Sequence, residues 1–147
     1  MNALELLEKE HEDIDRELIE LETISNSEII NYPNLIHVFG NLVSLWNEHE
    51  KKEEKIFPIM KKEKIIVPVQ KMLFDHKDLR VHKYSMLKAI DSASEIEMKK
   101  ALEEHGKMII EKLRKHIDDE DQVLYTIALS EFTDKEIEDM AIASGLK

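Results

Sequence analysis

Residues 35–60 read LIHVFGNLVSLWNEHEKKEEKIFPIM, and the spacing of apolar residues in this stretch decides the fold class. Steps of three and four residues place side chains on one face of an α-helix. His49 and Glu53 continue the apolar row at these steps, so an imidazole and a carboxylate occupy the face that should pack into the core. The stretch therefore predicts a long amphipathic helix with polar groups on its buried side. The positions in the row are Leu35, Val38, Leu42, Leu45, His49, Glu53, Ile56 and Met60.

Three other segments show the same period, and each carries a histidine in its apolar row. The first helix of the chain should end near the polar cluster at residues 25–27. The third should begin at Pro68, which suits the start of a helix, and its row is interrupted at Lys83. The fourth should follow Ser94, because Ser94 and Glu97 have the spacing of a capping box. The chain therefore predicts four long amphipathic helices.

The connections between these helices are short, which forces neighbouring helices to run antiparallel. Residues 61–67 should form the turn between the second and third helices. Thr133 and Glu136 form a second capping box, which should open a short helix through about Ala143. We therefore expect an all-α fold in a single domain over residues 1–147. Its architecture should be an antiparallel up-down-up-down four-helix bundle with a short C-terminal fifth helix.

The composition agrees with a helical protein and excludes several classes of function. Three Gly and three Pro are fewer than the roughly ten and seven that average usage would give, and too few for the turns of a sheet protein. The absence of cysteine excludes disulfides, zinc–thiolate sites and iron–sulfur clusters bound by this chain. The net charge of −11 disfavours nucleic acid, and the acidic first residues are unlike a signal peptide. No stretch approaches the roughly 18 apolar residues of a membrane span, so we expect a cytoplasmic protein that binds neither nucleic acid nor membrane.

One histidine on each long helix lies at a matched depth in the expected bundle. His11 and His76 come roughly eight residues after their helices begin, whereas His49 and His116 come roughly ten before theirs end. In an up-down-up-down bundle these positions belong to the same end and agree to within about one helical turn. His49 and His116 are each followed four residues later by a glutamate, about 40° around the helix and one turn along it. Six side chains should therefore converge on one layer of the core: His11, His49, Glu53, His76, His116 and Glu120.

Imidazoles and carboxylates cannot share an apolar layer without a compensating charge, because burying an isolated ion is costly. Two divalent cations would offset the negative charges of Glu53 and Glu120. An oxo or hydroxo bridge between the two cations would supply further negative charge. Such donors on facing helices suit two iron ions, with manganese or zinc as alternatives. A single histidine of this set would more often be an ordinary core residue, and a single His-x-x-x-Glu pair an ordinary ion pair. The matched set of six favours a metal centre.

In the order of these residues the chain resembles the hemerythrin-like, or HHE cation-binding, family. The resemblance covers nearly the whole chain. It rests on the contexts EKEHEDI around His11, WNEHEKKEEKIFP around His49, LFDHKDLR around His76 and LRKHIDDEDQVLY around His116. It implies an antiparallel four-helix bundle that holds a non-haem di-iron centre, in which the two glutamates bridge the irons and the histidines fill terminal positions.

Two positions depart from the pattern of the oxygen-carrying hemerythrins. Those proteins have His-x-x-x-His on the third helix, but the residue four positions after His76 is Arg80. They also carry the last carboxylate as an aspartate five residues after the histidine. Asp121 stands at that spacing, yet Glu120 lies closer to His116 around the helix, so we expect Glu120 to bridge and keep Asp121 as the alternative. Four histidines and two carboxylates would leave an open coordination position on each iron.

Four side chains near the expected centre keep more than one interpretation. Glu50 could add a ligand, although a solvated surface position is favoured. Arg80 should either extend to water or pair with a carboxylate close to the metals. Trp46 and Tyr125 could line a ligand pocket or belong to the apolar core, and for Trp46 the core is favoured.

The three remaining histidines are weaker candidates. His37 and His82 lie about 120° around the helix from the ligand on their own helix, which favours surface or boundary positions. His105 shares a face with His116 but lies about 16 Å from it along the axis. We expect His105 to cap a polar layer at the opposite end of the bundle rather than to bind the central metals.

An open coordination position is what binding or redox chemistry of a diatomic molecule requires. The expected function is therefore a non-haem di-iron protein that binds or senses oxygen or nitric oxide. The alternative is a di-iron redox or iron-centre repair protein, which would reduce nitric oxide or peroxide or deliver iron. A metal-free or zinc-loaded structural bundle is a third possibility. The pattern identifies no protein partner.

Overall fold

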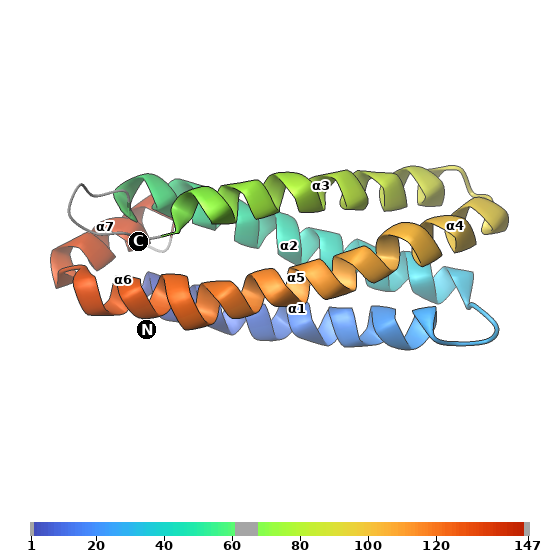
Figure 1. Ribbon diagram of the computed structural model, residues 1–147, viewed down its shortest axis with the longest axis horizontal. Coiled ribbons are helices and arrows are strands. Elements are labelled where there is room, and N and C mark those ends of the chain that lie inside the picture. Colours follow the sequence, from blue (N-terminus) through green and yellow to red (C-terminus); the bar gives the residue numbers. More distant parts are fainter. Residues whose placement is uncertain (1, 61–67, 146–147) are drawn as a thin grey trace.

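The computed structural model describes residues 2–60 and 68–145, and every regular element in these ranges is a helix. The prediction of an all-α fold is thereby confirmed, whereas the turn expected at residues 61–67 lies outside the described residues. In Figure 1 the long helical rods lie side by side, with the short α7 at one end. The first three rods are α1 (Ala3–Ser25), α2 (Tyr32–Met60) and α3 (Val69–Asp91).

The fourth rod is one continuous helix whose hydrogen-bond pattern changes twice, which the sequence did not predict. Its α-helical parts are α4 (Glu95–Ala101), α5 (Lys107–Asp119) and α6 (Tyr125–Glu131). They are joined by two π-helical segments, η1 (Leu102–Gly106) and η2 (Glu120–Leu124). A π turn adds a residue to the turn and so rotates the side chains that follow it.

The predicted signals at the helix ends correspond to real caps. The Ser94 hydroxyl accepts the backbone N–H of Glu97 at 3.3 Å, and α4 begins directly after Ser94. Thr133 and Glu136 form a complete capping box at the start of α7 (Asp134–Ala143). Capping of this kind satisfies N–H groups that have no partner within the helix.

The apolar core is divided into two clusters by one polar layer. One cluster, which includes Leu18, Phe39 and Leu113, fills the half of the bundle next to the α1–α2 connection. The other includes Leu7 and Phe57, and Met140 of α7 closes its end. All four rods pass from one cluster through the polar layer into the other, so the layer lies deep inside the protein.

Lys83, which interrupts the apolar row of the third helix, lies inside the bundle. Its side chain is buried, its ammonium group donates to Asn47 Oδ1 at 2.7 Å, and its Nζ lies 4.7 Å from the centre of the Trp46 ring. A cation over an indole face is held by the ring quadrupole. Burial lowers the pKa of this amine. Trp46 itself belongs to the apolar core, as favoured from the sequence.

No helix in the described part of the chain combines the length and the apolar character needed to cross a membrane.

The core packing predicts a large difference between buried and exposed aliphatic positions. Leu18 is fully buried, so we expect Leu18→Ala to lower the free energy of unfolding by about 2–5 kcal/mol through lost burial and a residual cavity. Ile29 is 88% exposed, and Ile29→Ala should change it by less than about 0.5 kcal/mol. Urea unfolding of the two variants measures both values, and equal losses would contradict the assigned core.

Candidate metal centre

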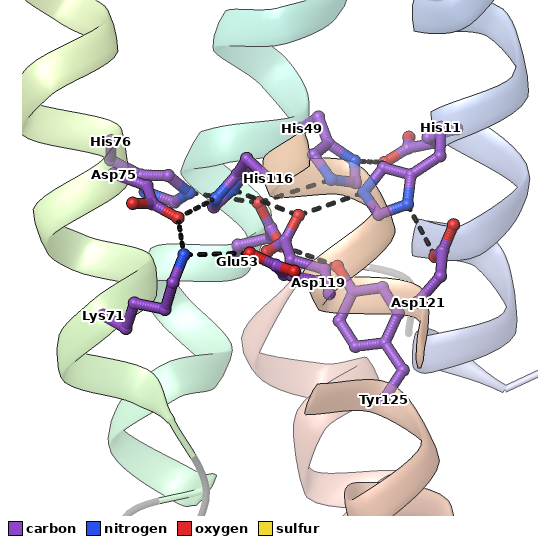
Figure 2. A network of polar contacts seen from close by, with 12 residues as sticks. His11, His49, Glu53, Lys71, Asp75, His76, His116, Asp119, Asp121 and Tyr125 are labelled. Carbon is purple, nitrogen blue, oxygen red and sulfur yellow. Dashed lines mark hydrogen bonds and ion pairs between the residues drawn. The ribbon is translucent and has the colours of Figure 1, made fainter. Parts of the chain in front are cut away.

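Six side chains from the four rods meet in the polar layer between the two apolar clusters (Figure 2). These are the six residues that the sequence pattern singled out, and each is at most 4% exposed. They are His11 from α1, His49 and Glu53 from α2, His76 from α3, His116 from α5 and Glu120 from η2.

The six side chains form two groups of possible metal ligands that share both glutamates. In each group, one ligand atom from every residue lies within 4.8 Å of the others. The rings of His11 and His49 lie 4.5 Å apart between centroids, and those of His76 and His116 lie 4.9 Å apart. One group is His11, His49, Glu53 and Glu120, and the other is Glu53, His76, His116 and Glu120.

Each shared glutamate contacts two histidines, one from each group. Glu53 Oε1 lies 3.3 Å from the Nε2 atoms of both His49 and His76. Glu120 Oε1 lies 3.1 Å from His11 Nε2 and 3.2 Å from His116 Nε2. The Nε2 atoms of all four imidazoles therefore face the two carboxylates at the centre of the layer.

Several polar atoms in the layer lack a hydrogen-bond partner, and a bound cation could satisfy them. Within the described residues, His49 Nε2, His116 Nε2 and Glu120 Oε2 are buried and make no hydrogen bond. The two nitrogens approach carboxylate oxygens closely but without hydrogen-bond geometry. Leaving such atoms unpaired costs free energy, whereas a metal ion would accept lone pairs from all of them. The donor set therefore fits a metal site.

Three further carboxylates orient three of the histidines by accepting hydrogen bonds at Nδ1, on the side of each ring that points away from the central glutamates. The Nδ1–H group of His11 donates to Asp121 Oδ1 at 2.7 Å, and that of His49 donates to Glu10 Oε1 at 3.0 Å. His116 Nδ1 pairs in the same way with Asp75 Oδ2 at 2.9 Å. A proton on Nδ1 leaves the Nε2 lone pair free for a metal, and this arrangement is typical of metal-binding histidines.

His76 has a different environment on its outer side. Its Nδ1 lies 3.9 Å from Glu54 Oε1, beyond hydrogen-bond distance, and the guanidinium group of Arg80 holds Glu54 at 2.8 and 2.9 Å. Arg80 also pairs with Glu50, which is buried, so the surface position favoured for Glu50 is wrong. Of the two alternatives for Arg80, pairing with carboxylates near the cluster is the one observed, and its partners are not the shared glutamates.

The hydroxyl group of Tyr125 reaches one of the shared glutamates. It donates to Glu53 Oε2 at 2.5 Å, and its ring stacks on His11 with centroids 5.6 Å apart. Segment η2 makes this contact possible, because its i→i+5 bond from the Tyr125 N–H to the Glu120 carbonyl adds one residue to the turn. Burial and the nearby carboxylates raise the pKa of Tyr125 well above its usual value, so the hydroxyl keeps its proton.

Without a bound cation, the cluster balances its charge with protons. Burial opposes the charged form of His49, but Glu53 and Glu10 outweigh it and raise the pKa of this imidazole to about 10. Burial opposes the charge on His116 in the same way, and nearby carboxylates raise its pKa to about 10. Burial also opposes the charge on Glu53, yet the adjacent imidazoles hold the pKa of its carboxyl well below the usual range. A cation that binds here must displace protons from the histidines.

The remaining histidines lie outside this cluster. His37 is exposed and contacts Asn41, in agreement with the expected surface position. His105 was expected to cap a polar layer, but its Nδ1 lies 3.0 Å from the Nδ1 of His82. The two rings therefore form a separate pair between α3 and η1.

The orienting carboxylates Glu10 and Asp75 were not predicted, and Asp121 was considered only as a ligand. Each is the sequence neighbour of a residue in the cluster but pairs with a histidine on a different rod. An acidic residue next to a core histidine was therefore the available signal. The partner on the other rod could not be identified without knowing how the helices pack.

A buried group of imidazoles and carboxylates between packed helices defines a helical metal-binding protein. A family model for the hemerythrin HHE cation binding domain matches residues 2–128, which includes all six residues of the cluster. The chain therefore belongs to the hemerythrin HHE cation-binding family, a family of cation-binding, usually iron-binding, domains. No curated protein and no solved structure matches the chain.

The raised pKa values predict a pH-dependent stability for the chelator-treated protein. His49 and His116 hold protons up to about pH 10 in the folded chain but only up to about 6.5 when unfolded. Their stabilising contribution is complete below pH 6.5 and is lost as the pH rises towards 10. We expect Tm to fall across this window, and to fall less with metal bound, because ligating imidazoles carry no extra proton. Identical pH profiles with and without metal would contradict this account.

If Asp75 orients His116, replacing Asp75 should lower the metal affinity although all six metal-ligating side chains are still present. Asp75→Asn removes the charge behind His116, and we expect it to weaken iron binding by about 10- to 100-fold. Competition with a chromophoric chelator under anaerobic conditions measures the affinity. Asp78→Asn is the matched control, since Asp78 lies one turn away on α3 and pairs with Lys112. A smaller loss for Asp75→Asn than for Asp78→Asn would exclude the orienting role.

Proposed function

We propose that the six side chains hold two iron ions within an up-down-up-down four-helix bundle, with Glu53 and Glu120 as bridging ligands. The observation that carries this proposal is that two groups of possible ligands, each with two imidazoles, share the same two carboxylates. Two divalent cations also offset the two buried negative charges. Imidazole and carboxylate donors together suit iron, and manganese or zinc would be weaker alternatives.

The donor count supports a site that binds a small molecule. Two imidazole nitrogens and two bridging oxygens give each ion four protein ligands, which is fewer than the six positions of an octahedral ion. A bound pair of iron ions supplies open positions for oxygen or nitric oxide and electrons for their redox chemistry. We therefore propose that the protein binds or senses one of these diatomic molecules.

The surrounding residues would keep such a position dry and fixed. The ring of Phe57 stacks on His76 with centroids 5.8 Å apart, and Tyr125 stacks on His11. Apolar clusters close the layer on both sides along the bundle. A water-excluded site strengthens the interactions between its charges and protects a reactive ligand from solvent.

A second candidate function, reduction of nitric oxide or peroxide, is favoured by the contacts of Tyr125 and Asp75. The Tyr125 hydroxyl group donates a hydrogen bond to Glu53 Oε2 at 2.5 Å, so it keeps a proton inside the polar layer. Asp75 links His116 to the half-exposed Lys71, whose ammonium donates to Asp75 Oδ2 at 2.7 Å. These contacts would let protons be held beside the centre and exchanged with solvent, which reduction requires and simple binding does not.

The proposal predicts two iron ions per chain that depend on the shared glutamates. We expect the full-length protein, loaded anaerobically with iron(II), to retain about two irons per chain. The double variant His49→Ala, Glu53→Ala removes a terminal ligand and a bridge, so it should retain at most one. Glu48→Ala is the control, because Glu48 lies on the exposed face of the same helix. Full iron content in the double variant would overturn the assignment.

Exposure of the iron-loaded protein to oxygen or nitric oxide separates the two candidate functions. Binding predicts an absorption change that reverses when the gas is removed. Reduction predicts consumption of the gas with an irreversible change of the iron spectrum, and a slower reaction in Tyr125→Phe. An unchanged spectrum with oxygen and nitric oxide would contradict binding, and an unchanged spectrum with nitric oxide and with added peroxide would contradict reduction.

A further inference from the structure

Two histidines outside the central cluster meet between α3 and the π segment η1. His82 Nδ1 lies 3.0 Å from His105 Nδ1, and the ring centroids are 5.3 Å apart. Both side chains are half-buried, with 27% of the His105 side chain exposed, so solvent reaches the pair. The eleven residues between His105 and His116 place this pair about 16 Å along the helix from the central cluster.

The separation of the two nitrogens matches that of ligands on one metal ion. Two imidazoles bound to zinc at about 2.0–2.1 Å have nitrogens about 2.9 Å apart at a right angle and about 3.3 Å apart at a tetrahedral angle. The observed 3.0 Å lies between these values. The central histidine pairs show the same close approach of rings from different helices, with centroids 4.5 and 4.9 Å apart. Without an ion, the two facing Nδ1 atoms can share only one proton.

The charges around the pair are compatible with a cation. Burial and the nearby Lys112 lower the pKa of His82. The charge of Lys112 is itself paired with Asp78 at 2.8 Å, one turn before His82 on α3. On the outer side, Glu104 Oε2 lies 3.9 Å from His105 Nε2 and adds negative charge next to the ring.

We propose that His82 and His105 form a second, peripheral site for a divalent transition-metal ion, with two imidazole nitrogens and water as ligands. Imidazole ligands without thiolate suit zinc, copper or nickel, and an ion that keeps water ligands at a solvent-accessible site can exchange. The site would join α3 to the fourth rod through a bond that the apolar core does not provide. This inference does not depend on which metal, if any, occupies the central cluster.

Zinc binding to the full-length protein tests the proposal. We expect the wild-type chain to bind one more zinc ion than His82→Ala and His105→Ala in isothermal titration. Because the central cluster is unchanged in all three chains, the difference counts the peripheral ion alone. His37→Ala, which removes an exposed histidine, is the control and should keep the wild-type stoichiometry. Circular dichroism checks that the variants are folded.

Two further measurements keep the test decisive. In the wild-type chain, zinc should shift the ring ¹⁵N resonances of His82 and His105 but not those of His37, and this requires no variant. The added zinc should also raise Tm in the wild type more than in His82→Ala, because the ion binds only the folded arrangement. Equal zinc stoichiometry in the wild type and both variants, or unshifted His82 and His105 resonances, would overturn the proposal.

Discussion

The burial of the Glu53 and Glu120 carboxylates inside the helical core is the constraint on which the rest of the structure depends. An ionised carboxylate in an apolar interior is tolerated only with an opposite charge close by. The Nε2 atoms of four imidazoles supply that environment at 3.1–3.3 Å. This requirement explains why one layer of the bundle is polar while the clusters on both sides of it are apolar.

The same constraint extends outward from the centre in steps. An imidazole that contacts a central carboxylate through Nε2 also needs a hydrogen-bond partner for its Nδ1–H group. Asp121, Glu10 and Asp75 accept these hydrogen bonds from three of the imidazoles. Glu10 and Asp75 are in turn paired with lysines nearer to the surface, Lys52 and Lys71. Charge therefore alternates in sign from the buried layer to the solvent. Each shell fixes the orientation of the one inside it, which prepares the imidazoles for a metal.

Family membership and geometry together support a cation-binding role for the central cluster. The HHE domain matches the part of the chain that carries the cluster, and the cluster offers two sets of donors with two shared carboxylates. The peripheral pair of His82 and His105 repeats the approach of two imidazoles from different helices, without buried carboxylates. A site without that negative charge would hold its ion more weakly, so the two sites suit a retained ion and an exchangeable one.

The sequence by itself determined the helices and the membership of the central cluster. Because the helical period is regular, His49, Glu53 and their four counterparts could be assigned to one face and one depth before any packing was known. Contacts between rods could not be assigned in this way. The partner of Asp75 is a histidine 41 residues away in the sequence, and Arg80 can pair with Glu50 only because their two helices pack together. The reach of Tyr125 to Glu53 depends on the π segment at Glu120, which periodicity does not reveal. Local spacing therefore indicated which residues form the central cluster, whereas only tertiary packing decided which residues touch and that Glu50 is buried.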